Sequence, residues 1–278
     1  MHKHKRMDEH YNRKDAGKAL QQYIIDSMKT MTHHLAIKPQ NKWLNKTTVI
    51  SMDRERTWHM VQTDSDNQLE EVVFKLQGIL VKKDLSPVTE VPIKENYAFL
   101  QQYVQIIRLG GDAFKDTADS IMEAQLIDLA LDISNRYFET MKTHPQEQAE
   151  FEPGMDPKGI LAAAGIKRNL IHMEDKKVWF YMSKVDENGE RKFIMTEPQI
   201  FRIGDIVEVQ LSIIAVLMKK LQRKLKLKLR MVAMINESFT KERARVMHKN
   251  AIMDKAEMKV RGNAADKQRT SLKCKVGY

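Results

Sequence analysis

The sequence predicts an α+β protein, in which a helical N-terminal domain is followed by a small antiparallel β-sheet or partial barrel and a basic C-terminal tail. Up to about residue 141 apolar side chains recur every three to four residues, as in amphipathic helices, whereas farther on they alternate with polar ones, as in half-buried strands. Basic charge collects late in the chain, because residues 202–278 hold 19 Lys and Arg against 7 Asp and Glu. That local excess is larger than the net charge of +10 for all 278 residues.

The domain boundaries follow from composition. The sequence KTHPQEQAEFEPGMDP combines Pro, Gly and acidic residues with little apolar periodicity, which is typical of a linker. The expected parts are a mainly helical domain at 1–141, this linker at 142–157, an antiparallel β module at 158–240 and a basic helical or disordered tail at 241–278.

Helices account for most of the expected N-terminal domain. The apolar spacing predicts four of them, at 15–35, 67–80, 95–109 and 112–137. Asn67 and Glu70 form a capping-box pattern at the start of the second helix, and Gly110 ends the third. A short hairpin is expected between the first two helices, because TTVISM and TWHMVQT are β-rich runs separated by the charged DRER.

The expected β module begins with a hairpin. KVWFYMSKV is rich in β-forming residues, DENG supplies a turn in which Gly189 tolerates a positive φ, and ERKFIM returns as the partner strand. In the following FRIGDIVEVQLSIIAV, Gly204 permits a tight bend, and Asp205 can accept hydrogen bonds from the turn backbone before the next strand begins at Ile206. We interpret these two residues and Gly189 as structural turn residues.

The segment KLQRKLKLKLRMVAMI fits a strand better than a helix. In a helix, adjacent Lys and Leu would lie about 100° apart, and the basic charge would spread around the whole cylinder. In a strand, the leucines fall on one side and the lysines on the other. We expect this strand to pair with residues 206–216. Beyond it, TKERARVMHKNAIMDKAEM can form a helix, and disorder is expected after Gly262.

Four motifs in succession resemble a family of uncharacterised proteins from mushroom-forming (basidiomycete) fungi. They are DPKGIL, IHMEDKKVWFY, PQIFRIGDIVEVQLS and KLRMVAMINESFT, and they cover about residues 156–240. The family pattern includes an F-R-x-G-D-I-V-E-x-Q strand, and this sequence departs from the wider pattern at Met173, Lys176 and Asn236. The resemblance implies a shared fold and a fungal source, and it implies no activity, cofactor or catalytic residue.

The sequence carries no catalytic motif, so neither an enzyme nor a cofactor is expected. LGGD lacks both the dinucleotide-binding spacing and the P-loop Lys, and it is interpreted as a helix stop. The HKHK and HH sequences lack the Cys or carboxylate partners of a defined metal site, and G-x-S-x-G and H-E-x-x-H do not occur. Two acidic pairs, Glu174 with Asp175 and Asp205 with Glu208, are interpreted as residues of turns and exposed strand faces.

Basic residues are densest between positions 219 and 230, where seven Lys and Arg occur without one acid. Alternate side chains of a strand project about 6.6 Å apart on one face, which lets a row of Lys contact successive phosphates. Aromatic rings on the neighbouring hairpin can stack on bases. The predicted nucleic-acid-binding residues are Lys219, Lys220, Arg223, Lys224, Lys226, Lys228, Arg230, Trp179 and Tyr181. The alternative is an edge strand that its lysines protect from aggregation.

Two functions are therefore open. One is a non-enzymatic binding module that engages nucleic acid through the basic strand and the tail. The other is a structural or protein-interaction module whose helical domain contacts another protein. The single cysteine, Cys274, cannot form an intrachain disulfide and favours an intracellular location, cytoplasmic or nuclear. A membrane partner is not expected, because the N-terminus has no apolar signal sequence and no run approaches about 20 apolar residues.

Overall fold

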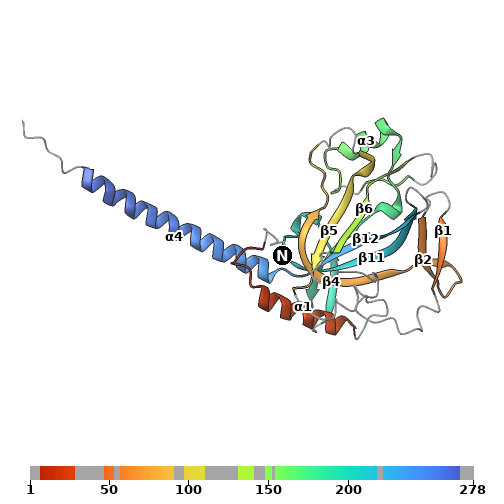
Figure 1. The fold of residues 1–278 in the computed structure, drawn as a ribbon, viewed down its shortest axis with the longest axis horizontal. Coiled ribbons are helices and arrows are strands. Elements are labelled where there is room, and N and C mark those ends of the chain that lie inside the picture. The colour runs from red at the N-terminus through yellow and green to blue at the C-terminus, as the bar shows by residue number, and fades with distance from the viewer. Residues whose placement is uncertain are drawn as a thin grey trace, which may run out of the picture.

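The structure is a computed structural model that describes residues 7–28, 47–52, 57–90, 97–109, 131–140, 148–151, 154–188, 190–217 and 222–269. Within these ranges one ten-stranded mixed sheet dominates the chain (Figure 1). Its strands are β1 (Thr47–Met52), β2 (Thr57–Thr63), β3 (Leu69–Glu71), β4 (Val73–Asp84), β5 (Gln101–Ile107), β6 (Leu131–Arg136), β9 (Trp179–Val185), β10 (Arg191–Met195), β11 (Ile206–Leu217) and β12 (Arg223–Asn236).

Helices and short elements complete the described part of the chain. The α-helices are α1 (Arg13–Met28), α3 (Ile160–Arg168) and α4 (Ser238–Arg269). The 3-10 helices are η2 (Tyr97–Phe99), η3 (Glu174–Lys176) and η4 (Pro198–Ile200), and β7 (Glu139–Thr140) pairs with β8 (Leu170–Ile171) in a separate two-stranded sheet.

Five strands of the large sheet close on themselves. The hydrogen-bonded neighbours run from β4 through β5, β6 and β12 to β11, and β11 pairs again with β4. The contacts in this ring are antiparallel except for β6 with β12, which is parallel and joins only Lys228 and Ser134. The ring is therefore a small barrel with its weakest seam at that contact. Beyond the ring, β2 and β1 extend the sheet from residues 214–216 of β11, which we call its outer end. On the other side, β9 and β10 extend it from residues 231–234 of β12, which we call the inner end of that strand.

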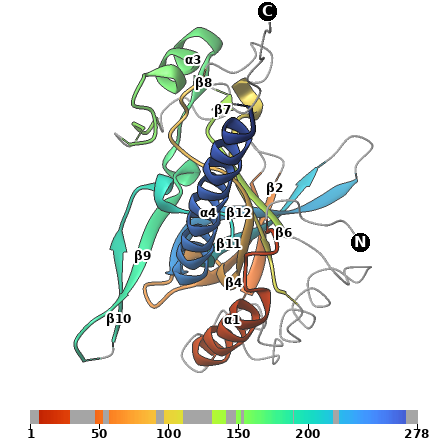
Figure 2. The same cartoon turned by 90° about the vertical axis from the view of Figure 1, so that its left-hand side faces the viewer.

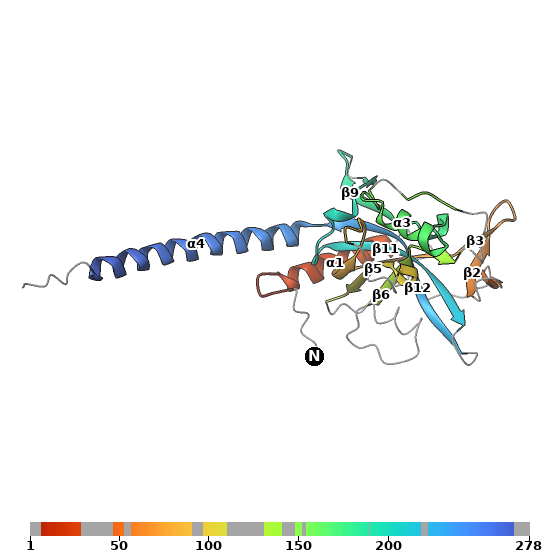
Figure 3. The same cartoon turned by 90° about the horizontal axis from the view of Figure 1, so that it is seen from above.

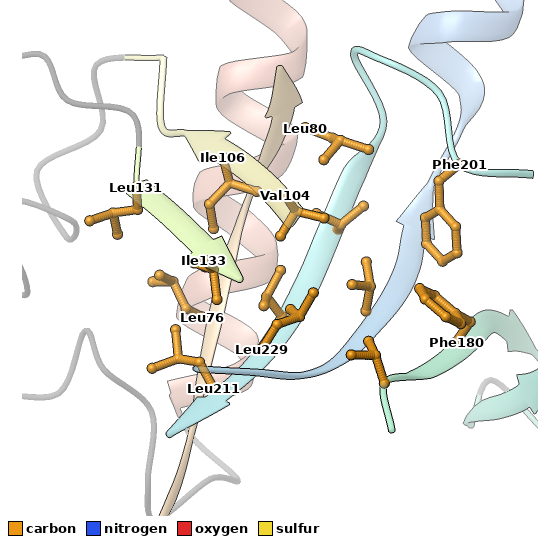
Figure 4. Packing of buried hydrophobic residues seen from close by; sticks show 14 of the residues in the cluster. Leu76, Leu80, Val104, Ile106, Leu131, Ile133, Phe180, Phe201, Leu211 and Leu229 are labelled. Atoms are coloured by element: carbon orange, nitrogen blue, oxygen red, sulfur yellow. The ribbon is translucent and has the colours of Figure 1, made fainter. Parts of the chain in front are cut away.

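The main hydrophobic core fills the inside of this ring. Figure 4 shows side chains from β4, β5, β6, β11 and β12 pointing toward one another, among them Leu80, Val104, Ile133, Leu211 and Leu229. These five side chains are fully buried. A second cluster lies outside the ring, where α1 packs on β4 and buries the side of that strand that faces away from the core. As a result β4 is covered on both of its faces.

The long helix α4 leaves the sheet at the inner end of β12 and extends away from the body of the molecule (Figures 1 and 2). Its first turn is fixed by a hydrogen bond of 2.6 Å that the Thr240 hydroxyl donates to the buried carboxylate of Asp205. The preceding Gly204 has φ +105°, and a Cβ there would lie 2.8 Å from the Tyr11 ring, so the turn requires glycine. Arg243 pairs with Asp8 of the N-terminal segment.

The predicted fold class is wrong, because the first half of the chain is largely strand rather than helix. Residues predicted as helices at 67–80, 95–109 and 131–137 belong mainly to β3, β4, β5 and β6, while residues 112–130 of the fourth predicted helix lie outside the described part. Burial on two faces explains the error in β4: Leu76 and Leu80 face the main core, whereas Ile79 and Val81 face α1. A strand buried on both sides forms a continuous apolar run that also contains helical spacings.

Several other predictions from the sequence are confirmed. The first helix, the β1–β2 hairpin, the β9–β10 hairpin and the antiparallel pairing of β11 with β12 are all present. The predicted C-terminal helix is also present, although it continues through Arg269 instead of giving way to disorder after Gly262. Strands from both sides of the predicted linker at 142–157 belong to the same ten-stranded sheet. The domain boundaries stay a prediction.

Candidate functional site

A hollow of about 570 Å³ opens beside the basic strand β12. One wall is the outer part of the β11–β12 hairpin with β2, and the other is the outward face of β5 and β6. Figure 3 shows this hairpin extending from the body on the side away from α4. The residues that line the hollow are Thr57, His59, Gln101, Leu131, Asp132, Ser134, Asn135, Arg136, Glu139, Lys176, Ile214, Val216, Lys224, Leu225, Lys226, Leu227 and Lys228.

Strand register explains why so many lysines meet here. Side chains that are paired across a ladder point to the same face, so Lys224 shares a face with Val216 and Thr57, and Lys226 shares it with Ile214. At the seam, Lys228 is paired with Ser134 of β6, which extends this face onto the second wall. The alternation predicted from sequence therefore places three lysines of β12 in the hollow.

The outer two of these lysines are exposed. Lys224 and Lys226 have no hydrogen bond or ion pair with a described residue, and Arg136 reaches the same hollow from β6. Partial burial lowers the pKa of Lys226, and the nearby Arg136 and Lys224 cations lower it further. A lysine whose charge is disfavoured by neighbouring cations is one that a bound anion would stabilise.

The inner lysine, Lys228, is instead buried in an ion pair. Its Nζ atom lies 2.6 Å from Asp175 Oδ2, and Lys176 Nζ lies 3.3 Å from the same oxygen. Lys176 also lies 3.1 Å from Glu139 Oε1. Burial by itself would raise the pKa of Asp175, but the two ammonium groups outweigh that effect and the pKa is lowered. These pairs form a closed floor at the inner end of the hollow.

Arg230 continues this network away from the hollow. It pairs with Glu71 of β3, donates a hydrogen bond of 3.1 Å from Nε to the Ser212 hydroxyl, and donates another of 2.7 Å to the backbone carbonyl of Asp175. Glu71 in turn accepts a hydrogen bond of 2.8 Å from Nδ1 of His59. Arg230 occupies the bulge between β11 and β12, which turns it out of the lysine row.

The β5–β6 wall carries polar and aromatic groups. Asp132 Oδ1 accepts hydrogen bonds of 2.7 Å from the Tyr103 hydroxyl and 2.8 Å from Gln105 Nε2. Burial and this hydrogen bond raise the pKa of Tyr103, so the phenol stays protonated and donates. Arg136 lies 5.5 Å from the centre of the Phe99 ring, and that ring is 64% exposed. An open aromatic ring therefore borders a cation at the rim.

The other predicted binding residues do not share this site. Arg223 lies on the opposite face of β12, 4.4 Å from the Trp58 ring centre, because positions 223 and 224 alternate. Trp179 and Tyr181 lie on β9, where they pair with Met231 and Ala233 at the inner end of β12. The remaining predicted residues, Lys219, Lys220 and Gly189, lie outside the described part of the chain.

The interpretation of the acidic pairs needs correction. Asp205 and Glu208 are buried, not exposed on a strand face. Asp205 accepts hydrogen bonds from Thr240 and from the backbone N–H of Arg202, and burial raises its pKa. Glu208 accepts a hydrogen bond of 2.8 Å from Gln77 Nε2. Asp175, a third exposed, is engaged with the lysines of the floor. None of these contacts joins two carboxylates, so the arrangement gives no acid–base dyad among them.

Sequence reasoning missed Asp132, Arg136, Phe99 and Tyr103. A signal was present, since QQYVQII and LDISNR both alternate polar and apolar residues, but the apolar residues were assigned to helical stripes. Among the residues that the structure describes, no group of three or more His, Cys, Asp or Glu is placed to hold a metal ion. In the same residues, no helix is long and apolar enough to cross a membrane.

Comparison with known proteins adds no relative. No protein-family model matches the chain, and no curated protein sequence is similar to it. The resemblance of residues 156–240 to proteins of mushroom-forming fungi stays a prediction, and function has to be argued from the site itself.

Proposed function

We propose that this protein is a non-enzymatic binding module that holds single-stranded nucleic acid in the hollow beside β12. The observation that carries the proposal is that Lys224, Lys226 and Arg136 converge on one hollow while every carboxylate of its floor is already paired with another lysine. A polyanion that enters the hollow therefore meets cations that form no ion pair with a described carboxylate. Release of counterions from its phosphates favours this association.

The strand order supports the same proposal. The order β4-β5-β6-β12-β11, with a parallel contact between its third and fifth strands in chain order, corresponds to the OB-fold, a partly open five-stranded Greek-key barrel. OB-folds bind oligonucleotides and oligosaccharides on the face of their second and third strands and at the loop between the fourth and fifth. In this chain those strands are β5 and β6, which form one wall of the hollow.

The rim favours a single strand over a duplex. Bases of a single strand are free to stack on aromatic rings, which contributes about 1–3 kcal/mol per base. Phe99 offers an open ring beside Arg136, and Tyr103 lies on the same face of β5 as Gln101. A duplex keeps its bases stacked inside, so their faces are not open to such rings. The single cysteine favours an intracellular location for this protein, where nucleic acid is available as a partner.

The helix α4 is expected to contribute separately. Its 32 residues contain nine Lys and Arg against four Asp and Glu, and every described side chain from Met247 to residue 256 is exposed. It begins at the inner end of β12 (Figure 3), and the strand numbering places Lys224 and Lys226 toward the outer end. We therefore expect α4 to attract the polyanion without forming part of the hollow.

Fluorescence anisotropy with labelled single-stranded and duplex oligonucleotides, at two or more salt concentrations, tests the proposal. The Lys224→Glu/Lys226→Glu variant should bind the single strand more weakly, and its salt dependence should fall by about 1.4 in log–log slope, for two lost phosphate contacts. The matched control is Lys14→Glu/Lys184→Glu, which makes the same charge change at exposed positions outside the hollow. Equal losses in both variants, or no binding by the wild type at low salt, would refute the proposal.

A second candidate function, protein interaction, is favoured by β10. This edge strand exposes both faces, and the hairpin that contains it stands out from the sheet (Figure 2). Its large apolar side chains Phe193, Ile194 and Met195 are 41%, 46% and 62% exposed. An exposed, apolar edge is able to pair with a strand of another protein. If the partner is a second copy of this chain, a tagged wild-type chain should co-purify with an untagged one, and Ile194→Lys should abolish this co-purification.

A further inference from the structure

Asp132 is unusual among the residues that line the hollow. The other carboxylate there, Glu139, is neutralised by Lys176 at 3.1 Å. Asp132 has no ion pair with a described residue, and its two hydrogen bonds come from the uncharged Tyr103 and Gln105. An exposed carboxylate is therefore held in place on the wall that faces the basic strand.

Both of these hydrogen bonds end on one oxygen. Tyr103 and Gln105 donate to Oδ1, which fixes the orientation of the carboxyl group and leaves Oδ2 as the acceptor that a ligand can reach. A carboxylate oxygen accepts hydrogen bonds and cannot donate them at neutral pH. It repels phosphate, so a strand bound along Lys224 and Lys226 would place its backbone at the lysines and a base toward Asp132.

We propose that Asp132 selects the base that enters the hollow, in favour of bases that carry an exocyclic amino group. This inference rests on the proposed function. Cytosine, adenine and guanine each present an N–H₂ donor on the Watson–Crick edge, and a carboxylate is a suitable acceptor for it. Thymine and uracil present two carbonyl oxygens around a single N–H, so a carboxylate meets acceptors on either side of that donor.

The chemistry of the neighbouring residues makes the selection reversible by one substitution. In Asp132→Asn, the side-chain carbonyl can keep the hydrogen bonds from Tyr103 and Gln105, so the amide nitrogen takes the place of Oδ2. The reachable atom then changes from an acceptor to a donor. The variant should therefore favour the carbonyl groups of thymine, and a residue with a merely structural role would not change the order of the bases.

The test compares the affinities of full-length protein for oligo(dC), oligo(dA) and oligo(dT) of equal length at one salt concentration. The wild type should bind oligo(dC) and oligo(dA) about tenfold more tightly than oligo(dT), the discrimination expected for one charged hydrogen bond. Asp132→Asn should remove or reverse this ratio. The matched control, Asp66→Asn, removes one negative charge from an exposed turn outside the hollow and should keep the wild-type ratio.

The outcomes separate this inference from the proposed function. Binding of all three oligonucleotides with equal affinity, or a wild-type preference for oligo(dT), would overturn base selection while the binding function stands. Base selection is overturned in the same way if Asp132→Asn strengthens binding of all three by one factor, because that result shows only lost repulsion. Failure of the wild type to bind any of them at low salt would overturn both.

Discussion

The basic part of β12, from Lys224 to Arg230, has an outer half and an inner half that use their cations differently. In the outer half Lys224 and Lys226 are exposed and point into a hollow, whereas in the inner half Lys228 and Arg230 are engaged by carboxylates. Those carboxylates come from distant segments: Asp175 lies 53 residues before Lys228, and Glu71 lies 159 residues before Arg230. A row of cations is thus divided into a binding part and a structural part by what the rest of the fold places beside it.

We expect the greatest loss of stability when a carboxylate of the structural part is removed. Asp175→Ala removes the carboxylate that Lys228 and Lys176 share and leaves two buried ammonium groups with less compensation. We expect the free energy of unfolding to fall by about 2 kcal/mol, somewhat less than for a fully buried pair, because Asp175 is a third exposed and Lys176 keeps Glu139. Urea unfolding measures this loss. Lys224→Glu/Lys226→Glu should stay within about 0.5 kcal/mol of the wild type, and a loss as large as that of Asp175→Ala would erase the distinction between the halves.

A substitution at Lys228 tests whether the inner half takes part in binding. Lys228→Met keeps the length of the side chain and removes its charge, so the stability should fall by about 1 kcal/mol while Asp175 retains Lys176. The salt dependence of oligonucleotide binding should stay at its wild-type slope, because Lys228 is 6% exposed and already paired. Anisotropy titrations at several salt concentrations measure the slope. A decrease of about 0.7 would mean that Lys228 contacts a phosphate, and that the inner half also binds nucleic acid.

The sequence could predict the division of faces in β12 but not this division of roles. Alternation is a local property, so the pairing of β11 with β12 and the exposure of Lys224 and Lys226 follow from it. The partners of Lys228 and Arg230 depend on which strands the fold brings alongside. In the sequence Asp175 is half of a simple acidic pair, and nothing local distinguishes it from Glu174.

The same reasoning explains which strands the sequence hid. In β4 the main core and α1 cover opposite faces. Apolar residues on both sides remove the period of two on which a strand is recognised. Because β5 and β6 were assigned to helices, the second wall of the hollow, with Asp132 and Arg136, was also missed. In β5 and β6 the alternation is present, since one face of each strand is outward, but their apolar residues also fit a helical spacing.

Low pH should weaken the ion pairs that Asp175 forms in the inner half. The pKa of Asp175 is lowered in the folded protein, although burial opposes this, because the Lys228 and Lys176 cations outweigh it. Its stabilising contribution is therefore complete above the ordinary value of 3.8 and is lost as the pH falls through the lower, folded value. Urea midpoints measured from about pH 6 to about pH 3 should decline less in Lys228→Met than in the wild type, because without one of the two cations the folded pKa of Asp175 lies closer to its ordinary value. Identical declines would mean that Lys228 does not hold the charge of Asp175.

Binding should change the protonation of Lys226, in the outer half, by a small amount. Partial burial, with Arg136 and Lys224 nearby, lowers the pKa of Lys226, and a bound phosphate would raise it again. Between the lowered value and the ordinary 10.5, the complex then holds more protons than the free protein, so affinity falls as the pH rises through that window. Calorimetry at about pH 9 in two buffers with different ionisation enthalpies should detect a fractional proton taken up on binding.

Lys226→Arg, which stays charged, should remove the uptake, and Lys184→Arg should leave it unchanged. Uptake that persists in Lys226→Arg would assign the proton to another group and separate Lys226 from the phosphate contact.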